Sequence, residues 1–182
     1  MNTPNKLTVI RMILVPVFMS FALASGTVNL AIALGVFILA SLTDWLDGKI
    51  ARASGQITTF GKFMDPLADK LLTTAAFLVF MDMKLISPWV IIIILFREFA
   101  VSGIRLVAAG TGEVIAASIW GKLKTVSQMA AVILTFLLLL IPAGDEQTKY
   151  IIINTAVWIS TILTLTSGAD YILKNRKLLV MK

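Results

Sequence analysis

Residues 31–80 read AIALGVFILASLTDWLDGKIARASGQITTFGKFMDPLADKLLTTAAFLVF, and this stretch sets the expected fold. An apolar run leads into a segment rich in charges and glycines, and a second apolar run follows it. Each run approaches the length of about 20 residues that a helix needs to cross a bilayer core. Because a short segment joins the runs, we expect two antiparallel membrane helices whose charged ends meet near one membrane surface.

The same apolar character extends over the whole chain of 182 residues. Hydrophobic residues make up 58% of it and charged residues 14%, whereas soluble domains carry about 25% charged residues. The apolar stretches also lack the alternation of barrel strands. The sequence therefore predicts an all-α fold, a polytopic membrane bundle of about six transmembrane helices in a single domain over residues 1–182. The expected spans are 7–25, 28–46, 66–81, 88–109, 123–141 and 150–173.

The basic residues predict the orientation of the bundle. With the N-terminus in the cytoplasm, every Lys and Arg except Lys84 and Lys149 falls on the cytoplasmic side, which is the bias of the positive-inside rule. Both termini are therefore expected in the cytoplasm. The net charge of +6 favours contact with anionic membrane lipids or phosphates, and no basic run with interleaved aromatics indicates nucleic acid. An alternative for residues 12–24 is a cleaved signal peptide, because basic residues precede this run.

Four aspartates flank the charged segment. Because the chain has no Cys and no His, acid–base or metal chemistry rests on its ten carboxylates. Asp44 and Asp47 are close enough in sequence to share one face of a helix, and the same holds for Asp65 and Asp69. Carboxylates gathered at one depth repel each other, and hard divalent cations relieve this repulsion. An all-oxygen ligand set favours Mg²⁺, Mn²⁺ or Ca²⁺, and four carboxylates suit two ions about 4 Å apart that clamp a phosphoryl displacement.

Other residues of the segment fit a phosphate ligand. Gly48 and Gly61 would allow close approach of a bulky group, and Arg52 could pair with phosphate in bidentate fashion. The alternatives are structural: the glycines could be helix-packing surface, Arg52 an interfacial charge, and the aspartates helix caps, as the pair Asp65-Pro66 indicates. A cation transporter is a further alternative, although it predicts acidic residues spread over several helices and depths.

The segment resembles the signature of the CDP-alcohol phosphotransferase family. This signature is Asp-x2-Asp-Gly-x2-Ala-Arg-x8-Gly-x3-Asp-x3-Asp, and the chain matches its fixed positions without a departure in residue or spacing. The matching residues are Asp44, Asp47, Gly48, Ala51, Arg52, Gly61, Asp65 and Asp69. Residues 4–11 also resemble the N-terminal signature of the family. Residues 97–105 and 121–125 resemble its bacterial branch that makes phosphatidylglycerophosphate.

The resemblance implies an activity, cofactors and partners. The enzyme would move the phosphatidyl group of CDP-diacylglycerol to sn-glycerol 3-phosphate, giving phosphatidylglycerophosphate and CMP, with the help of two divalent cations, Mg²⁺ or Mn²⁺. The alternative acceptors are inositol phosphate, serine or a phosphatidyl group. The resemblance further implies a homodimer in the bacterial plasma membrane, with its active site facing the cytoplasm.

The resemblance also implies roles for individual residues. Asp69 would be the general base that accepts the proton of the acceptor hydroxyl. The metal ligands would be Asp44, Asp47, Asp65 and Asp69. The residues that bind the CDP-lipid would be Asn5, Thr8, Gly48, Ala51, Arg52, Thr58 and Gly61.

The phosphate group of the acceptor is a dianion and needs cations near the site. The candidates are Lys62, Arg97, Arg105, Lys122 and Lys124, of which Lys62, Arg105 and Lys124 are favoured. Arg97 and Arg105 are about two helical turns apart, on nearly one face of the expected helix 88–109. An Arg within an apolar span is costly and is usually paired. The alternative for Arg97 is therefore an ion pair with Glu98 or a motif aspartate, or a side chain that reaches the membrane interface.

Overall fold

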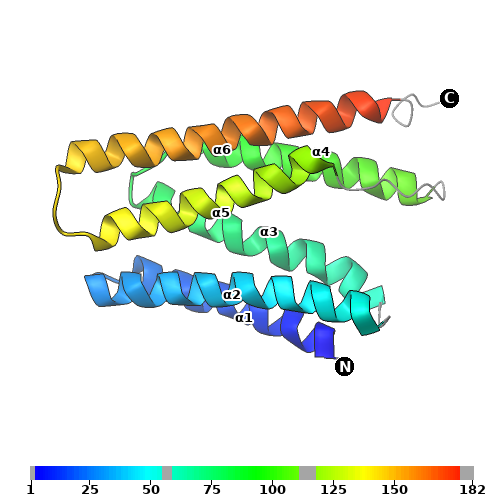
Figure 1. Ribbon diagram of the computed structural model, residues 1–182, viewed down its shortest axis with the longest axis horizontal. Helices are drawn as coiled ribbons and strands as arrows, with labels where there is room; N and C mark the ends of the chain where they lie inside the picture. The colour runs from blue at the N-terminus through cyan, green and yellow to red at the C-terminus, as the bar shows by residue number, and fades with distance from the viewer. Residues whose placement is uncertain (1–2, 55–58, 111–117, 177–182) are drawn as a thin grey trace. The chain divides into compact units, whose positions relative to one another are not determined.

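The computed structural model describes the backbone of residues 3–54, 59–110 and 118–176, and their side chains except those of residues 3–4, 44–54, 59–63, 65–66 and 69. Over these ranges the chain forms helices joined by short connections and no strand, so the predicted all-α class is confirmed. Each expected apolar stretch corresponds to one helix. Figure 1 shows the helices in chain order from blue to red: α1 (Thr3–Leu23), α2 (Thr27–Ser54), α3 (Thr59–Asp82), α4 (Pro88–Gly110), α5 (Ile119–Leu140) and α6 (Glu146–Lys174).

Large apolar side chains are exposed on several of these helices. Phe96 and Phe99 of α4 and Trp89 near its start are each about 70% exposed, and polar side chains such as Arg97 and Gln128 are buried. A soluble protein hides its large apolar side chains and exposes its charges. The reversed arrangement is typical of helices that face lipid.

Three of the described helices are long and apolar enough to cross a membrane on length and composition alone. They are Asn5–Leu23 within α1, Ile119–Leu140 as α5 and Glu146–Lys174 as α6. The apolar part of α2 is shorter, Thr27–Thr43. Helix α4 is of comparable length but carries the charges of Arg97, Glu98 and Arg105. The chain is therefore a helical protein of membrane type, and both the number of six spans and the cytoplasmic termini stay predictions.

The chain divides into two compact units. The first comprises Met1–Asp82 and Thr135–Ala143, and the second comprises Met83–Leu134 and Gly144–Lys182. In the first unit, α1 packs against both α2 and α3. The turn between α1 and α2 contains Gly26 with a φ of 109°, a conformation that glycine adopts without the steric cost of a side chain.

Phenylalanines form the core of the first unit. The ring centroid of Phe18 on α1 lies 5.9 Å from that of Phe37 on α2 and 5.8 Å from that of Phe136. The Phe136 ring lies 5.1 Å from that of Phe80 on α3. The rings are tilted or perpendicular to each other, as the charge distribution of aromatic rings favours. All four are fully buried, so one aromatic cluster holds these helices together.

In the second unit, α6 packs along α4, and Figure 1 shows the two side by side in orange-red and green. Helix α6 buries a stripe of small and hydroxyl residues. They are Ser160, Thr161, Thr164, Ser167 and Gly168. Thr164 donates to the carbonyl oxygen of Ser160 at 2.7 Å and accepts from Nε2 of Gln128 on α5 at 2.9 Å. Hydroxyls satisfied in this way can be buried, and small side chains let helices approach closely.

Side chains cap both ends of α6. Asp145 is the N-cap, and its Oδ2 accepts from the backbone N–H of Thr148 at 2.9 Å. Asn175 is the C-cap, and its side-chain amide donates to the carbonyl oxygen of Tyr171 at 2.7 Å. These bonds satisfy backbone groups that have no partner within the helix.

Candidate active site

The acidic motif lies on two neighbouring helices of the first unit. Helix α2 is continuous through Asp44 and Asp47. Helix α3 is continuous through Asp65 and Asp69. Each pair therefore lies on one face of its helix, and the two helices contact each other. The side chains of these aspartates are outside the described part of the structure, so their convergence on one site stays a prediction.

The structure decides the helix-cap alternative. Helix α3 begins at Thr59, and Asp65 lies in its interior. Helix α2 continues to Ser54, beyond Asp44 and Asp47. A cap residue flanks the helical turns and does not lie inside them. The cap alternative is therefore wrong for these three aspartates, and their carboxylates are not explained by helix termination.

The remaining motif residues are placed at the level of the backbone. Gly48, Ala51 and Arg52 lie on α2, and Gly61 and Lys62 lie on α3. Thr58 lies outside the described residues. Among the side chains that the structure does describe, no group of three or more acidic residues gathers so that it could hold a metal ion. The motif aspartates stay the predicted ligands, because their all-oxygen chemistry fits a hard divalent cation.

The beginning of α1 contributes a buried polar face to the first unit. Asn5 and Thr8, both expected to bind the CDP-lipid, are 8% and 1% exposed. Arg11 follows at the same spacing and is 1% exposed. Residues three apart share a helix face, so these side chains lie on one buried face of α1. Sequence reasoning gave Arg11 no site role, although its spacing from Thr8 was visible.

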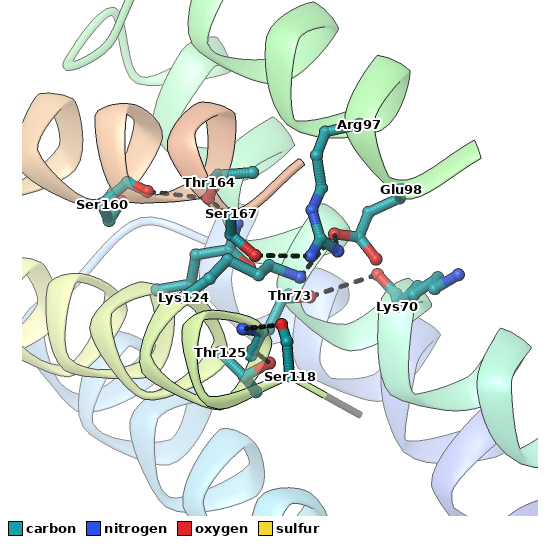
Figure 2. Close-up of polar contacts among 12 residues, drawn as sticks. Lys70, Thr73, Arg97, Glu98, Ser118, Lys124, Thr125, Ser160, Thr164 and Ser167 are labelled. Atoms are coloured by element: carbon teal, nitrogen blue, oxygen red, sulfur yellow. Dashed lines mark hydrogen bonds and ion pairs between the residues drawn. The ribbon is translucent and has the colours of Figure 1, made fainter. Parts of the chain in front are cut away.

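Three charged side chains meet inside the second unit. Figure 2 shows Arg97 and Glu98 of α4 close to Lys124 of α5. Oε1 of Glu98 accepts from Nη1 of Arg97 at 3.0 Å and from Nζ of Lys124 at 2.5 Å. All three residues are buried. The alternative that pairs Arg97 with Glu98 is therefore confirmed, and the structure adds Lys124 to the same carboxylate.

Two serines also contribute to the surroundings of this cluster. Nη2 of Arg97 donates to Oγ of Ser167 on α6 at 2.8 Å. Ser118 caps the start of α5, because its Oγ accepts from the backbone N–H of Gly121 at 3.0 Å. The cap fixes the first turns of α5 and with them the position of Lys124. The cluster thus draws on α4, α5 and α6.

The structure also describes Arg105 and Lys122, two further cations that were expected to bind the phosphate of the acceptor. Arg105, further along α4, donates from Nε to the hydroxyl oxygen of Tyr171 at 3.2 Å, and its guanidinium carbon lies 5.8 Å from the centre of that ring. Both a hydrogen bond and a cation–π contact therefore hold this exposed Arg. Lys122 on α5 is exposed. The side chain of Lys62 lies outside the described residues.

Two cations lie close together in this cluster, because Arg97 and Lys124 both donate to the same oxygen of Glu98. Phosphate groups bound to proteins commonly accept hydrogen bonds from a guanidinium and an ammonium group.

Sequence reasoning missed Ser167, Gly168 and Tyr171 of α6. A signal was present, because small and hydroxyl residues recur every three or four positions along this otherwise apolar helix. Such a stripe indicates a helix face that packs closely in membrane proteins. It does not reveal which residue of another helix it meets, so the contacts of Ser167 with Arg97 and of Tyr171 with Arg105 required the structure.

Fold and site together define a class of protein: a helical protein of membrane type, with an acidic motif on two neighbouring helices and a buried cation pair. Residues 1–166 match the model of the CDP-alcohol phosphatidyltransferase family. The chain belongs to this family, as the acidic motif predicts, and it is therefore a phosphatidyltransferase. Membership of the family also brings dependence on a divalent metal.

Named relatives match the chain over nearly its whole length. A Bacillus subtilis protein named CDP-diacylglycerol--glycerol-3-phosphate 3-phosphatidyltransferase is 43% identical, covering 96% of this chain and 95% of its own. A Rickettsia typhi protein of the same name is 34% identical, covering 93% and 94%. A Mycobacterium tuberculosis protein named probable phosphatidylglycerophosphate synthase is 36% identical, covering 94% and 80%. The alternative of a cation transporter finds no support in these matches.

Proposed function

We propose that this phosphatidyltransferase moves the phosphatidyl group of CDP-diacylglycerol to sn-glycerol 3-phosphate. The products are phosphatidylglycerophosphate and CMP. The observation that carries the proposal is the 43% identity, over 96% of the chain, to a relative whose name states this transfer. The buried cations Arg97 and Lys124 support it, because an acceptor that bears a phosphate needs such donors whereas serine does not.

The proposed reaction is a single displacement at phosphorus. A primary hydroxyl of the acceptor attacks the phosphorus that bears diacylglycerol. The new O–P bond forms as the P–O bond to CMP breaks, and CMP leaves with the electron pair of that bond. Asp69 accepts the proton of the hydroxyl as general base. A covalent intermediate is unnecessary, and the chain has neither Cys nor His to form one.

Two divalent cations, Mg²⁺ or Mn²⁺, are part of the proposal. The proposed ligands are Asp44, Asp47, Asp65 and Asp69. When bound, the ions would stabilise the negative charge on the pyrophosphate oxygens. The support is the oxygen-only donor set on two helices that contact each other. The proposed ligands of the CDP-lipid are Asn5, Thr8, Gly48, Ala51, Arg52, Thr58 and Gly61.

Arg97 and Lys124 are the leading candidates to bind the phosphate of the acceptor. Both cations donate to the same oxygen of Glu98 and therefore lie close together. One phosphate group could bind to both of them. Arg105, held by Tyr171, is a further candidate, as are Lys62 and Lys122. A dianion that bonds to several such donors would be held in a fixed orientation for the transfer.

The proposal places the enzyme in the bacterial plasma membrane. The enzyme is proposed to be a single domain over residues 1–182 with six spans. Both termini and the active site are proposed to face the cytoplasm. The support is the basic character of the connections on that side. A homodimer, implied by the family resemblance, is included in the proposal.

An acceptor panel tests the proposed function. The purified full-length protein is incubated with CDP-diacylglycerol, Mg²⁺ or Mn²⁺, and one acceptor at a time: sn-glycerol 3-phosphate, inositol phosphate, serine or phosphatidylglycerol. We expect CMP release only with glycerol 3-phosphate and only with a divalent metal. Faster release with another acceptor would assign the protein to a different branch of its family. Release that does not depend on any acceptor would contradict transfer.

A further inference from the structure

Gly168 on α6 lies directly against the side chain of Arg97. A Cβ atom built on Gly168 would lie 2.7 Å from Cγ of Arg97, and 3.7 Å from its Cβ and Nε. The first distance is far shorter than the contact distance of about 3.5–4.0 Å between carbon atoms. Cγ belongs to the stem of the side chain, near α4, and cannot swing away as a side-chain tip can. Any residue larger than glycine would therefore displace Arg97.

The tip of Arg97 is held as closely as its stem. Nη2 donates to Oγ of Ser167 at 2.8 Å, and Nη1 donates to Oε1 of Glu98 at 3.0 Å. Arg97 as a whole is 8% exposed. Within the described part of the protein, its Nε has no hydrogen-bond partner. The guanidinium is thus fixed in one orientation and retains a buried donor for a ligand.

We propose that Gly168 and Ser167 are positioning residues for the acceptor. Gly168 leaves the space in which the stem of Arg97 runs, and the hydroxyl of Ser167 fixes the guanidinium that binds the phosphate of glycerol 3-phosphate. Neither residue touches the substrate, and both act through Arg97. This inference rests on the proposed role of Arg97 in acceptor binding.

The surroundings allow the inference to be tested in a folded protein. A cavity of about 200 Å³ adjoins this pair and is lined by Phe96, Arg97, Leu165, Gly168 and Ile172 among others. The stem of a displaced Arg97 has room there, so a methyl group on Gly168 should move the guanidinium off its partners without unfolding the unit. Because helix interiors favour Ala over Gly, the helix itself should tolerate the change.

The experiment compares Gly168→Ala with a matched glycine. Gly35→Ala on α2 is the control, because a Cβ there would meet nothing within 4 Å. In the purified full-length enzyme, we expect Gly168→Ala to raise KM for glycerol 3-phosphate about tenfold, equivalent to about 1.4 kcal/mol. KM for CDP-diacylglycerol should stay within about twofold, since the lipid is proposed to bind elsewhere. Gly35→Ala should leave both constants unchanged.

A double-mutant cycle shows whether Gly168 acts through Arg97. Arg97→Ala alone should raise KM for glycerol 3-phosphate, and adding Gly168→Ala should produce no further rise. An equal rise in both backgrounds would mean that Gly168 serves only helix packing, and would overturn the inference. Should Arg97→Ala leave this KM unchanged, the acceptor role of Arg97 and the inference would both fail.

The inference and the proposed function can fail separately. If Arg97→Ala raises KM for glycerol 3-phosphate but Gly168→Ala does not, the positioning role is wrong and the proposed acceptor site stands. Ser167→Ala provides a second measurement that adds no volume and does not depend on how Gly168→Ala folds. We expect it to raise the same KM about threefold through loss of one hydrogen bond, and an unchanged constant would contradict the role of Ser167.

Discussion

Glu98 of α4 and Lys124 of α5 form an ion pair in the interior of the second unit, with 2.5 Å between Oε1 and Nζ. The same oxygen accepts from Arg97, so one carboxylate neutralises part of the charge of two cations. Ion pairs on a protein surface contribute little to stability, but removing one partner of a buried pair leaves an uncompensated charge. Glu98 therefore has a large expected effect on stability.

Replacement of Glu98 tests this relationship. We expect Glu98→Ala to lower the free energy of unfolding by about 3 kcal/mol, because two cations lose their buried counter-ion. Thermal unfolding of the purified protein in detergent measures the change. Glu146→Ala is the matched control, because Glu146 also pairs with a lysine but is 84% exposed, and its loss should cost less than about 1 kcal/mol. Equal effects of the two variants would contradict a buried, charge-balancing role for Glu98.

The contact between Arg105 and Tyr171 predicts a selective kinetic effect. Tyr171→Phe removes the hydroxyl that accepts from Nε of Arg105 and keeps the ring beneath the guanidinium. We expect KM for glycerol 3-phosphate to rise about threefold, because a less ordered Arg105 binds phosphate less well. Steady-state kinetics in both substrates would measure it, with Tyr150→Phe at an exposed position as the control. A rise confined to CDP-diacylglycerol would place Arg105 at the lipid instead.

The N-cap of α6 predicts a pH dependence of stability. The backbone N–H and the hydroxyl of Thr148 donate to Asp145, and these bonds hold the pKa of its carboxyl below the ordinary value of 3.8. A carboxylate with a lowered pKa stabilises the fold fully above its ordinary pKa, and this contribution is lost as the pH falls through the lowered value. We expect the melting temperatures of the wild type and Asp145→Asn to differ at pH 6 and to converge as the pH falls through the lowered pKa of Asp145.

The measurement is a melting curve of each protein at closely spaced pH values. Asn also caps helices, so the difference isolates the charge of Asp145 from the geometry of the cap. A gap that is constant with pH would show that the carboxylate charge contributes nothing.

Much of the fold follows from the sequence, since each apolar run became one helix and the acidic motif predicted the family. The helix boundaries did not follow as well. The apolar run 66–81 begins inside α3, whereas the helix itself begins at Thr59, because a helix can extend beyond its apolar part into polar sequence. For the same reason Asp65, which precedes a proline as caps often do, proved to lie within a helix.

The site could be predicted in part. The basic residues expected to bind the acceptor phosphate were proposed from their charge, and that role stays a prediction. The pairing of Arg97 with Glu98 was an open alternative because the two are adjacent in sequence. The contacts of Arg97 with Ser167 and Gly168 join helices that are far apart along the chain. A single sequence gives the faces of helices but not which faces meet, so these contacts could not be derived from it.

The central claim is that Asp69 promotes transfer of a phosphatidyl group to glycerol 3-phosphate. The most direct measurement is the incorporation of radiolabelled glycerol 3-phosphate into chloroform-soluble lipid by purified wild-type protein and by Asp69→Asn, with Asp82→Asn at an exposed position of α3 as the control. We expect labelled lipid from the wild type and from Asp82→Asn, and only when CDP-diacylglycerol and Mg²⁺ or Mn²⁺ are present. We expect no labelled lipid from folded Asp69→Asn. Labelled lipid from Asp69→Asn at the wild-type rate would contradict the account.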